Sequence, residues 1–65
     1  MYVKELIDNI CVAYYIVSIK KPGGDWIDYG SKEEVDIEWM DMTVDTFKYF
    51  ANPNNLFIIA EHERD

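Results

Sequence analysis

The stretch at residues 11–29, CVAYYIVSIKKPGGDWIDY, decides the fold because it places two strand-forming segments around one turn. Residues 11–20 are rich in β-branched and aromatic side chains, which favour β-strands. Pro22-Gly23-Gly24 is a strong turn signal, and the apolar segment 26–29 follows it. We therefore expect residues 26–29 to return antiparallel to residues 11–20 as a β-hairpin.

The elements on either side of this hairpin follow from side-chain spacing. The apolar residues near the N-terminus recur with the period of one helical face: Val3, Leu6, Ile7 and Ile10. This spacing predicts a short amphipathic helix at residues 3–10. Residues 43–50 are β-branched and aromatic and predict another strand. A turn is expected at residues 51–55, followed by a buried strand at residues 56–60.

Residues 31–42 fit two patterns. Ser31 and Glu34 have the spacing of a capping box, which indicates the start of a helix. The apolar residues then share one helical face: Val35, Trp39 and Met42. However, residues 35–39 also alternate between apolar and acidic side chains, which is typical of a strand. We favour a short helical or irregular turn leading into a strand, and the pattern leaves both readings open.

These elements predict the α+β class in a single domain spanning residues 1–65. The expected architecture is a small antiparallel sheet of three to four strands with a short N-terminal helix, and a second short helix if residues 31–42 are helical. A chain of this length buries only about 60% of the surface that its unfolded form exposes. Its aromatic side chains, or a partner chain, must therefore supply much of the stability.

The net charge of −7 is concentrated in one segment. Residues 25–45 hold eight carboxylates and one lysine, Lys32, which gives this segment a charge of −7. Residues 1–24 carry +1 and residues 46–65 carry −1, so these two segments cancel each other. A high negative charge keeps a small aromatic-rich domain soluble, and this alone is a sufficient explanation. The alternative is a negative face offered to a basic partner. The partner-binding residues predicted on that basis are Asp25, Asp28, Glu33, Glu34, Asp36, Glu38, Trp39, Asp41 and Asp45.

Catalytic and metal-binding patterns are lacking in the sequence. The only histidine, His62, lies in the acidic tail, and the only cysteine, Cys11, lies in an apolar run, so neither a catalytic triad nor a zinc site can be assembled. A calcium loop that started at Asp36 would need glycine at its sixth position, where Asp41 stands. We expect a protein that is not an enzyme and that needs no metal and no cofactor.

Partners and location are constrained in the same way. Six scattered basic residues do not form the cluster that nucleic-acid backbones require, so direct nucleic-acid binding is not expected. The apolar run at residues 10–19 is half the length that spans a bilayer, so membrane insertion is not expected either. An unpaired cysteine suits a reducing compartment, which predicts a cytoplasmic protein.

Three stretches resemble a class of small proteins encoded by phages and mobile elements of Gram-positive bacteria. They are Val3-Lys4-Glu5-Leu6-Ile7, the middle stretch DIEWMDMTV at residues 36–44, and Leu56-Phe57-Ile58-Ile59-Ala60-Glu61. The resemblance covers about half of the chain and carries no catalytic residues. It implies a phage setting, where short acidic proteins include inhibitors of bacterial defence such as anti-CRISPR proteins. In some of these inhibitors, carboxylates imitate the charge of DNA.

Two functions follow as hypotheses. The first is a phage-type inhibitor that docks a DNA-mimicking acidic face on a basic, nucleic-acid-binding host protein. Asp36 and Glu38 would contribute to that face from one side of an extended strand, about 6.6 Å apart. The second is a structural or assembly protein that forms a homodimer through strand edges and aromatic contacts. Its expected contact residues are Tyr14, Tyr15, Trp26 and Trp39.

Overall fold

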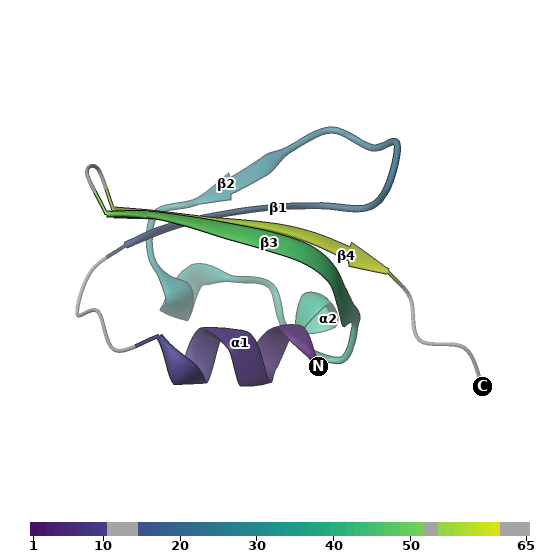
Figure 1. The fold of residues 1–65 in the computed structure, drawn as a ribbon, viewed down its shortest axis with the longest axis horizontal. Coiled ribbons are helices and arrows are strands. Elements are labelled where there is room, and N and C mark those ends of the chain that lie inside the picture. Colours follow the sequence, from purple (N-terminus) through teal and green to yellow (C-terminus); the bar gives the residue numbers. More distant parts are fainter. Residues whose placement is uncertain (11–14, 52–53, 62–65) are drawn as a thin grey trace.

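The computed structural model describes residues 1–10, 15–51 and 54–61 (Figure 1). Its elements, in chain order, are α1 (Val3–Asn9), β1 (Ile16–Lys20), β2 (Ile27–Tyr29), the 3₁₀ turn η1 (Lys32–Glu34), α2 (Ile37–Met40), β3 (Thr43–Ala51) and β4 (Asn54–Glu61). The expected helix and strands are therefore confirmed, but residues 51, 54 and 55, which were expected in a turn, belong to β3 and β4. Interpretations that concern Cys11, Tyr14, His62 and the turn residues 52–53 lie outside the described residues.

The four strands form one sheet in the order β2-β1-β4-β3. The α+β class with a small sheet is confirmed, but the sheet is mixed, since β1 and β4 pair in parallel. The β1–β2 and β3–β4 pairs are antiparallel, as the sequence predicts. The parallel pair arises because the chain between β2 and β3 passes beneath the sheet to its far edge (Figure 1). The strand β4 then returns from β3 into the centre, beside β1.

The predicted β1–β2 hairpin is confirmed. The amide of Gly24 donates to the carbonyl of Lys21 at 2.9 Å, which closes the turn. Gly23 has a φ of 77°, a left-handed conformation that glycine adopts without a steric penalty. The Pro22-Gly23-Gly24 signal therefore acts through backbone geometry.

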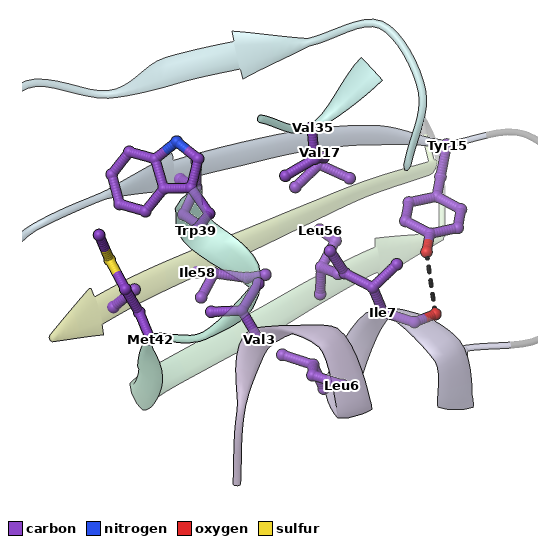
Figure 2. Packing of buried hydrophobic residues seen from close by; sticks show 12 residues of the cluster. Val3, Leu6, Ile7, Tyr15, Val17, Val35, Trp39, Met42, Leu56 and Ile58 are labelled. Atoms are coloured by element: carbon purple, nitrogen blue, oxygen red, sulfur yellow. Dashed lines mark hydrogen bonds between the residues drawn. The ribbon is translucent and has the colours of Figure 1, made fainter. Parts of the chain in front are cut away.

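Helices cover only one face of the sheet (Figure 1). The core lies between this face and the helices, and Figure 2 shows how α1, α2 and the strands contribute to it. The buried apolar residues are Val3, Leu6, Ile7, Tyr15, Val17, Ile19, Val35, Trp39, Met42, Leu56, Ile58 and Ala60. Three of the four apolar residues predicted to line α1 are among them. No helix of the described residues has the length and apolar character needed to cross a membrane.

The ambiguous residues 31–42 adopt two short helical turns, η1 and α2, which lead into β3. Val35, Trp39 and Met42 are all buried, as the helical pattern predicts. Ile37 is 81% exposed, although strict alternation would place it on the same side as Val35 and Trp39. The strand interpretation is therefore wrong. The predicted placement of Asp36 and Glu38 on one side of an extended strand is wrong for the same reason.

Tyr15 links the sheet to α1 through a buried hydrogen bond. Its hydroxyl donates to the carbonyl of Ile7 at 3.2 Å (Figure 2). Burial raises the pKa of Tyr15 above its ordinary value of 10.0, and the negative charges of Glu33 and Asp8 raise it further. The neutral phenol is therefore the form that the folded state favours.

Replacing Tyr15 with phenylalanine is expected to lower the free energy of unfolding by about 1 kcal/mol near neutral pH, because one buried hydrogen bond is lost. The carbonyl of Ile7 also accepts from the amide of Ile10 at 3.3 Å, so it keeps a partner. Since the folded state raises the pKa, this stabilisation is complete below pH 10.0 and is lost as the pH rises through the folded pKa. Urea unfolding at neutral and alkaline pH should show a smaller alkaline loss in Tyr15→Phe than in the wild type; equal losses would contradict this role.

Candidate binding surfaces

The face of the sheet opposite the helices has its own side-chain chemistry. In β4, Leu56, Ile58 and Ala60 point into the core and are fully buried. The alternate residues of β4 therefore lie on the open face, together with their strand partners. The open-face pairs are Ser18 with Phe57, Lys20 with Ile59, Thr46 with Ile59, Lys48 with Phe57 and Phe50 with Asn55.

Aromatic rings meet at the centre of this open face. The rings of Trp26 and Phe57 pack edge to face with centroids 5.4 Å apart. Phe50 packs on Phe57 in the same manner at 5.6 Å. Because β1 lies between β2 and β4, the ring of Trp26 reaches across β1, where the small Ser18 is only 2% exposed. The side-chain amide of Asn55 donates to the Ser18 hydroxyl at 3.2 Å, so this covered polar group is satisfied.

Two lysines lie against these rings. The Lys20 Nζ atom is 5.2 Å from the centroid of Trp26, and the Lys48 Nζ atom is 5.8 Å from that of Phe50. Both distances are within the range of a cation–π interaction. Thr46, Phe47 and Ile59 complete a shallow groove of about 350 Å³ between the rings. We call this surface the aromatic face and define it by Trp26, Phe50, Phe57, Ile59, Lys20 and Lys48.

The charges of the open face balance each other. The strand register places Asp28 opposite Ser18, and therefore on the same side as Phe57. Strand alternation from Phe57 places Glu61 on this side too. Lys20 and Lys48 thus share this side of the sheet with two carboxylates, so the charged side chains that the strand register assigns to the open face balance one another.

The opposite surface of the molecule, formed by the helical elements, is strongly negative. We call it the acidic layer and define it by the exposed carboxylates of α1, η1, α2 and their flanking residues: Glu5, Asp8, Glu33, Glu34, Asp36, Glu38 and Asp41. Only Lys4 and Lys32 oppose them in these elements. Among the described residues, none of the seven carboxylates forms a salt bridge. The charge of this layer is therefore available to a partner.

The nine predicted contact residues separate into three groups. Five lie together in the acidic layer: Glu33, Glu34, Asp36, Glu38 and Asp41. Asp25 and Asp28 lie beside or within β2, and Asp45 lies in β3. Because β2 and β3 are opposite edges of the sheet, these three aspartates do not join the other five. Trp39 belongs to neither surface.

Trp39 is a core residue. Its side chain is 5% exposed, and its indole Nε1–H donates to the Tyr29 hydroxyl at 3.0 Å. Tyr29 belongs to β2, so this bond ties α2 to the far edge of the sheet. A partner cannot reach the indole ring while the domain keeps this packing. We therefore remove Trp39 from the set of contact residues.

Both surfaces contain residues that the sequence did not predict as contact residues. Glu5 and Asp8 extend the acidic layer, and their i, i+3 spacing on the polar side of α1 was the available signal. Phe57 and Ile59 lie in the segment 56–60, for which the sequence predicts a buried strand, but both are only partly buried. Their alternation with Leu56 and Ile58 gave no warning because both sets are apolar. The meeting of Trp26 with Phe57 depends on the strand order and had no local signal.

Comparison of this chain with protein families, curated proteins and solved structures found no match. Within residues 1–10, 15–51 and 54–61, no group of three histidine, cysteine, aspartate or glutamate side chains is arranged to hold a metal ion. A functional interpretation must therefore rest on the two surfaces themselves.

Proposed function

We propose that this protein is a small, non-catalytic binding protein that docks its acidic layer on a basic surface of another protein. The observation that carries the proposal is the set of seven exposed carboxylates on one layer of the fold, with no salt bridge to any described residue. Unneutralised like charges repel one another and destabilise a compact domain. A basic partner would relieve this repulsion.

Electrostatics favours a partner rich in arginine. Carboxylates accept paired, charge-assisted hydrogen bonds from the planar guanidinium group, which are stronger than bonds between neutral groups. The negative layer would also attract a basic surface over a distance of about 8–10 Å at moderate ionic strength and speed the encounter. Nucleic-acid-binding proteins present such surfaces because they must bind phosphates.

The biological form of this proposal is a phage-type inhibitor of a host nucleic-acid-binding or defence protein. The acidic layer would occupy the site that a phosphate backbone uses, as in DNA-mimicking anti-CRISPR inhibitors. The resemblance of three short stretches to phage proteins supports this setting. The unpaired Cys11 is compatible with the reducing cytoplasm in which such an inhibitor would act.

A matched pair of variants tests whether the acidic layer makes the contact. Asp36→Asn/Asp41→Asn removes two charges from the layer, and asparagine is as good as aspartate at the Asp36 position before α2. Exposed ion pairs contribute roughly 0.2–1 kcal/mol each, so the affinity for an oligo-arginine peptide should fall by about 2- to 30-fold. Fluorescence anisotropy of the labelled peptide measures this loss, which should shrink as salt is added.

Asp25→Asn/Asp45→Asn is the control, because it removes the same charge from exposed aspartates at the edges of the sheet. It should change the affinity much less. Equal losses in the two variants would mean that only total charge matters, and the proposal would be wrong. A second arm uses double-stranded DNA bound to a basic DNA-binding protein: the wild type should displace the DNA, and Asp36→Asn/Asp41→Asn should do so less well.

A further inference from the structure

The aromatic face has no role in docking through the acidic layer, and two of its rings are nearly half exposed. Trp26 is 45% exposed and Phe50 is 48% exposed, and Ile16 on the same side of the sheet is 39% exposed. The groove between the rings is lined mainly by apolar side chains. Contiguous apolar surface of this kind, with polar groups at its rim, marks a contact site.

The edges of the sheet are poor sites for a partner strand. The edge strand β2 is only three residues long and carries Asp28 at its centre. The other edge, β3, has an irregularity between Val44 and Thr46, and it carries Asp45 and Lys48. Short length, bulges and charges are the features that protect sheet edges from pairing. A partner is therefore better received on the open face than along an edge.

The charges of the open face favour a second copy of this chain as the partner. With a net charge of −7, two copies of the chain repel each other in most orientations. The open face is the exception, because Lys20 and Lys48 balance Asp28 and Glu61 there. When two such faces meet about a two-fold axis, each copy offers lysines to the carboxylates of the other. The two acidic layers then lie on the outer sides of the pair, as far apart as the fold allows.

We propose that the aromatic face binds the aromatic face of a second copy of this chain, giving a two-fold symmetric homodimer. A two-fold interface uses one self-complementary patch twice, and a central apolar groove within a balanced rim meets that condition. The dimer also supplies the additional burial that a domain with a one-sided core lacks. It would present two acidic layers to the outside, but it does not depend on their function.

Analytical ultracentrifugation of the wild-type protein over a concentration series tests the proposal. The weight-average mass should rise toward twice that of the monomer as concentration increases. Phe50→Glu introduces a like charge into the interface from both copies and removes a ring that packs on Phe57, so it should shift the dissociation constant upward by at least about 100-fold. Ile37→Glu is the matched control, since Ile37 is an exposed apolar residue on the acidic layer, and it should leave the dimer intact.

A charge-swap experiment adds a test that does not depend on the aromatic rings. Lys20→Glu/Lys48→Glu and Asp28→Lys/Glu61→Lys should each be monomeric, because like charges then face one another across the axis. A mixture of the two variants should form a heterodimer. Circular dichroism must show native folding in each variant, and Phe50→Ser serves as a milder substitution if Phe50→Glu does not fold.

Three outcomes would overturn the proposal: a wild-type protein that is monomeric at every concentration, a dimer weakened equally by Ile37→Glu, or no heterodimer in the mixture. A monomer whose aromatic-face resonances shift on adding oligothymidylate or an apolar peptide would assign the face to that ligand instead. The Asp36→Asn/Asp41→Asn variant should dimerise like the wild type. Failure of the acidic-layer proposal and failure of this one are therefore distinguishable.

Discussion

Replacing Trp39 with alanine is expected to lower the free energy of unfolding by about 3–5 kcal/mol. The indole ring is buried between α2 and the sheet, and its loss leaves a cavity within the buried apolar cluster (Figure 2). The Tyr29 hydroxyl also loses its hydrogen-bond donor. Small domains are stable by only about 5–15 kcal/mol in total, so this one change removes a large share of the stability. Urea unfolding followed by circular dichroism measures it.

Trp26→Ala is the matched comparison, because it removes the other tryptophan from the open face. Its loss should cost about 1 kcal/mol, mainly from the edge-to-face contact with Phe57. The Trp39→Phe variant keeps only the exposed Trp26, and iodide should quench its fluorescence strongly. The Trp26→Phe variant keeps only the buried Trp39, and iodide should quench its fluorescence much less. A Trp39→Ala protein that keeps full stability but loses partner binding would contradict the core placement and restore Trp39 as a contact residue.

The second large effect is expected at Ile58, which is fully buried in β4. Ile58→Ala should lower the free energy of unfolding by about 2–5 kcal/mol, since burial is lost and a cavity forms in the core. The neighbouring substitution Ile59→Ala provides the control. Ile59 is the same residue type in the same strand but lies on the open face. The loss of strand propensity from Ile to Ala is therefore the same in both variants and cancels when their unfolding free energies are compared.

Ile59→Ala should cost clearly less than Ile58→Ala, because Ile59 is only partly buried. Urea denaturation of both variants at one protein concentration gives the comparison. It should be made at low concentration, where the proposed homodimer has dissociated. Equal costs would indicate that both faces of the sheet are buried in solution, which contradicts a one-sided core.

Much of the fold could be predicted because local sequence determines it. The period of Val3, Leu6 and Ile7 placed α1, and Pro22-Gly23-Gly24 placed the β1–β2 turn. At residues 31–42, the exposure of Ile37 distinguishes the helical structure from the strand. Ile37 is 81% exposed, and this can be seen only in the folded molecule. An isoleucine at that position satisfies the alternating pattern, so the sequence alone supported both readings.

The remaining features depend on long-range pairing. The parallel contact of β1 with β4 joins Ile16 to Asn55 across most of the chain, and no short pattern encodes it. The aromatic face depends on that contact, because β1 pairs with both β2 and β4 and so brings Trp26, which precedes β2, close to Phe57 in β4. The acidic layer was predictable in composition but not in extent. The helical turns collected five of its carboxylates, while the strands carried Asp28 and Asp45 to opposite edges of the sheet.

We propose that the two surfaces of this domain act separately and that a basic partner binds to the acidic layer. Titration of ¹⁵N-labelled protein with an oligo-arginine peptide, followed by amide chemical shifts, tests it residue by residue. The largest changes should fall on residues 33–41 and on the exposed side of α1, with little change at Phe50 and Phe57. Changes of equal size around Asp25, Asp28 and Asp45, or changes centred on the aromatic face, would contradict it.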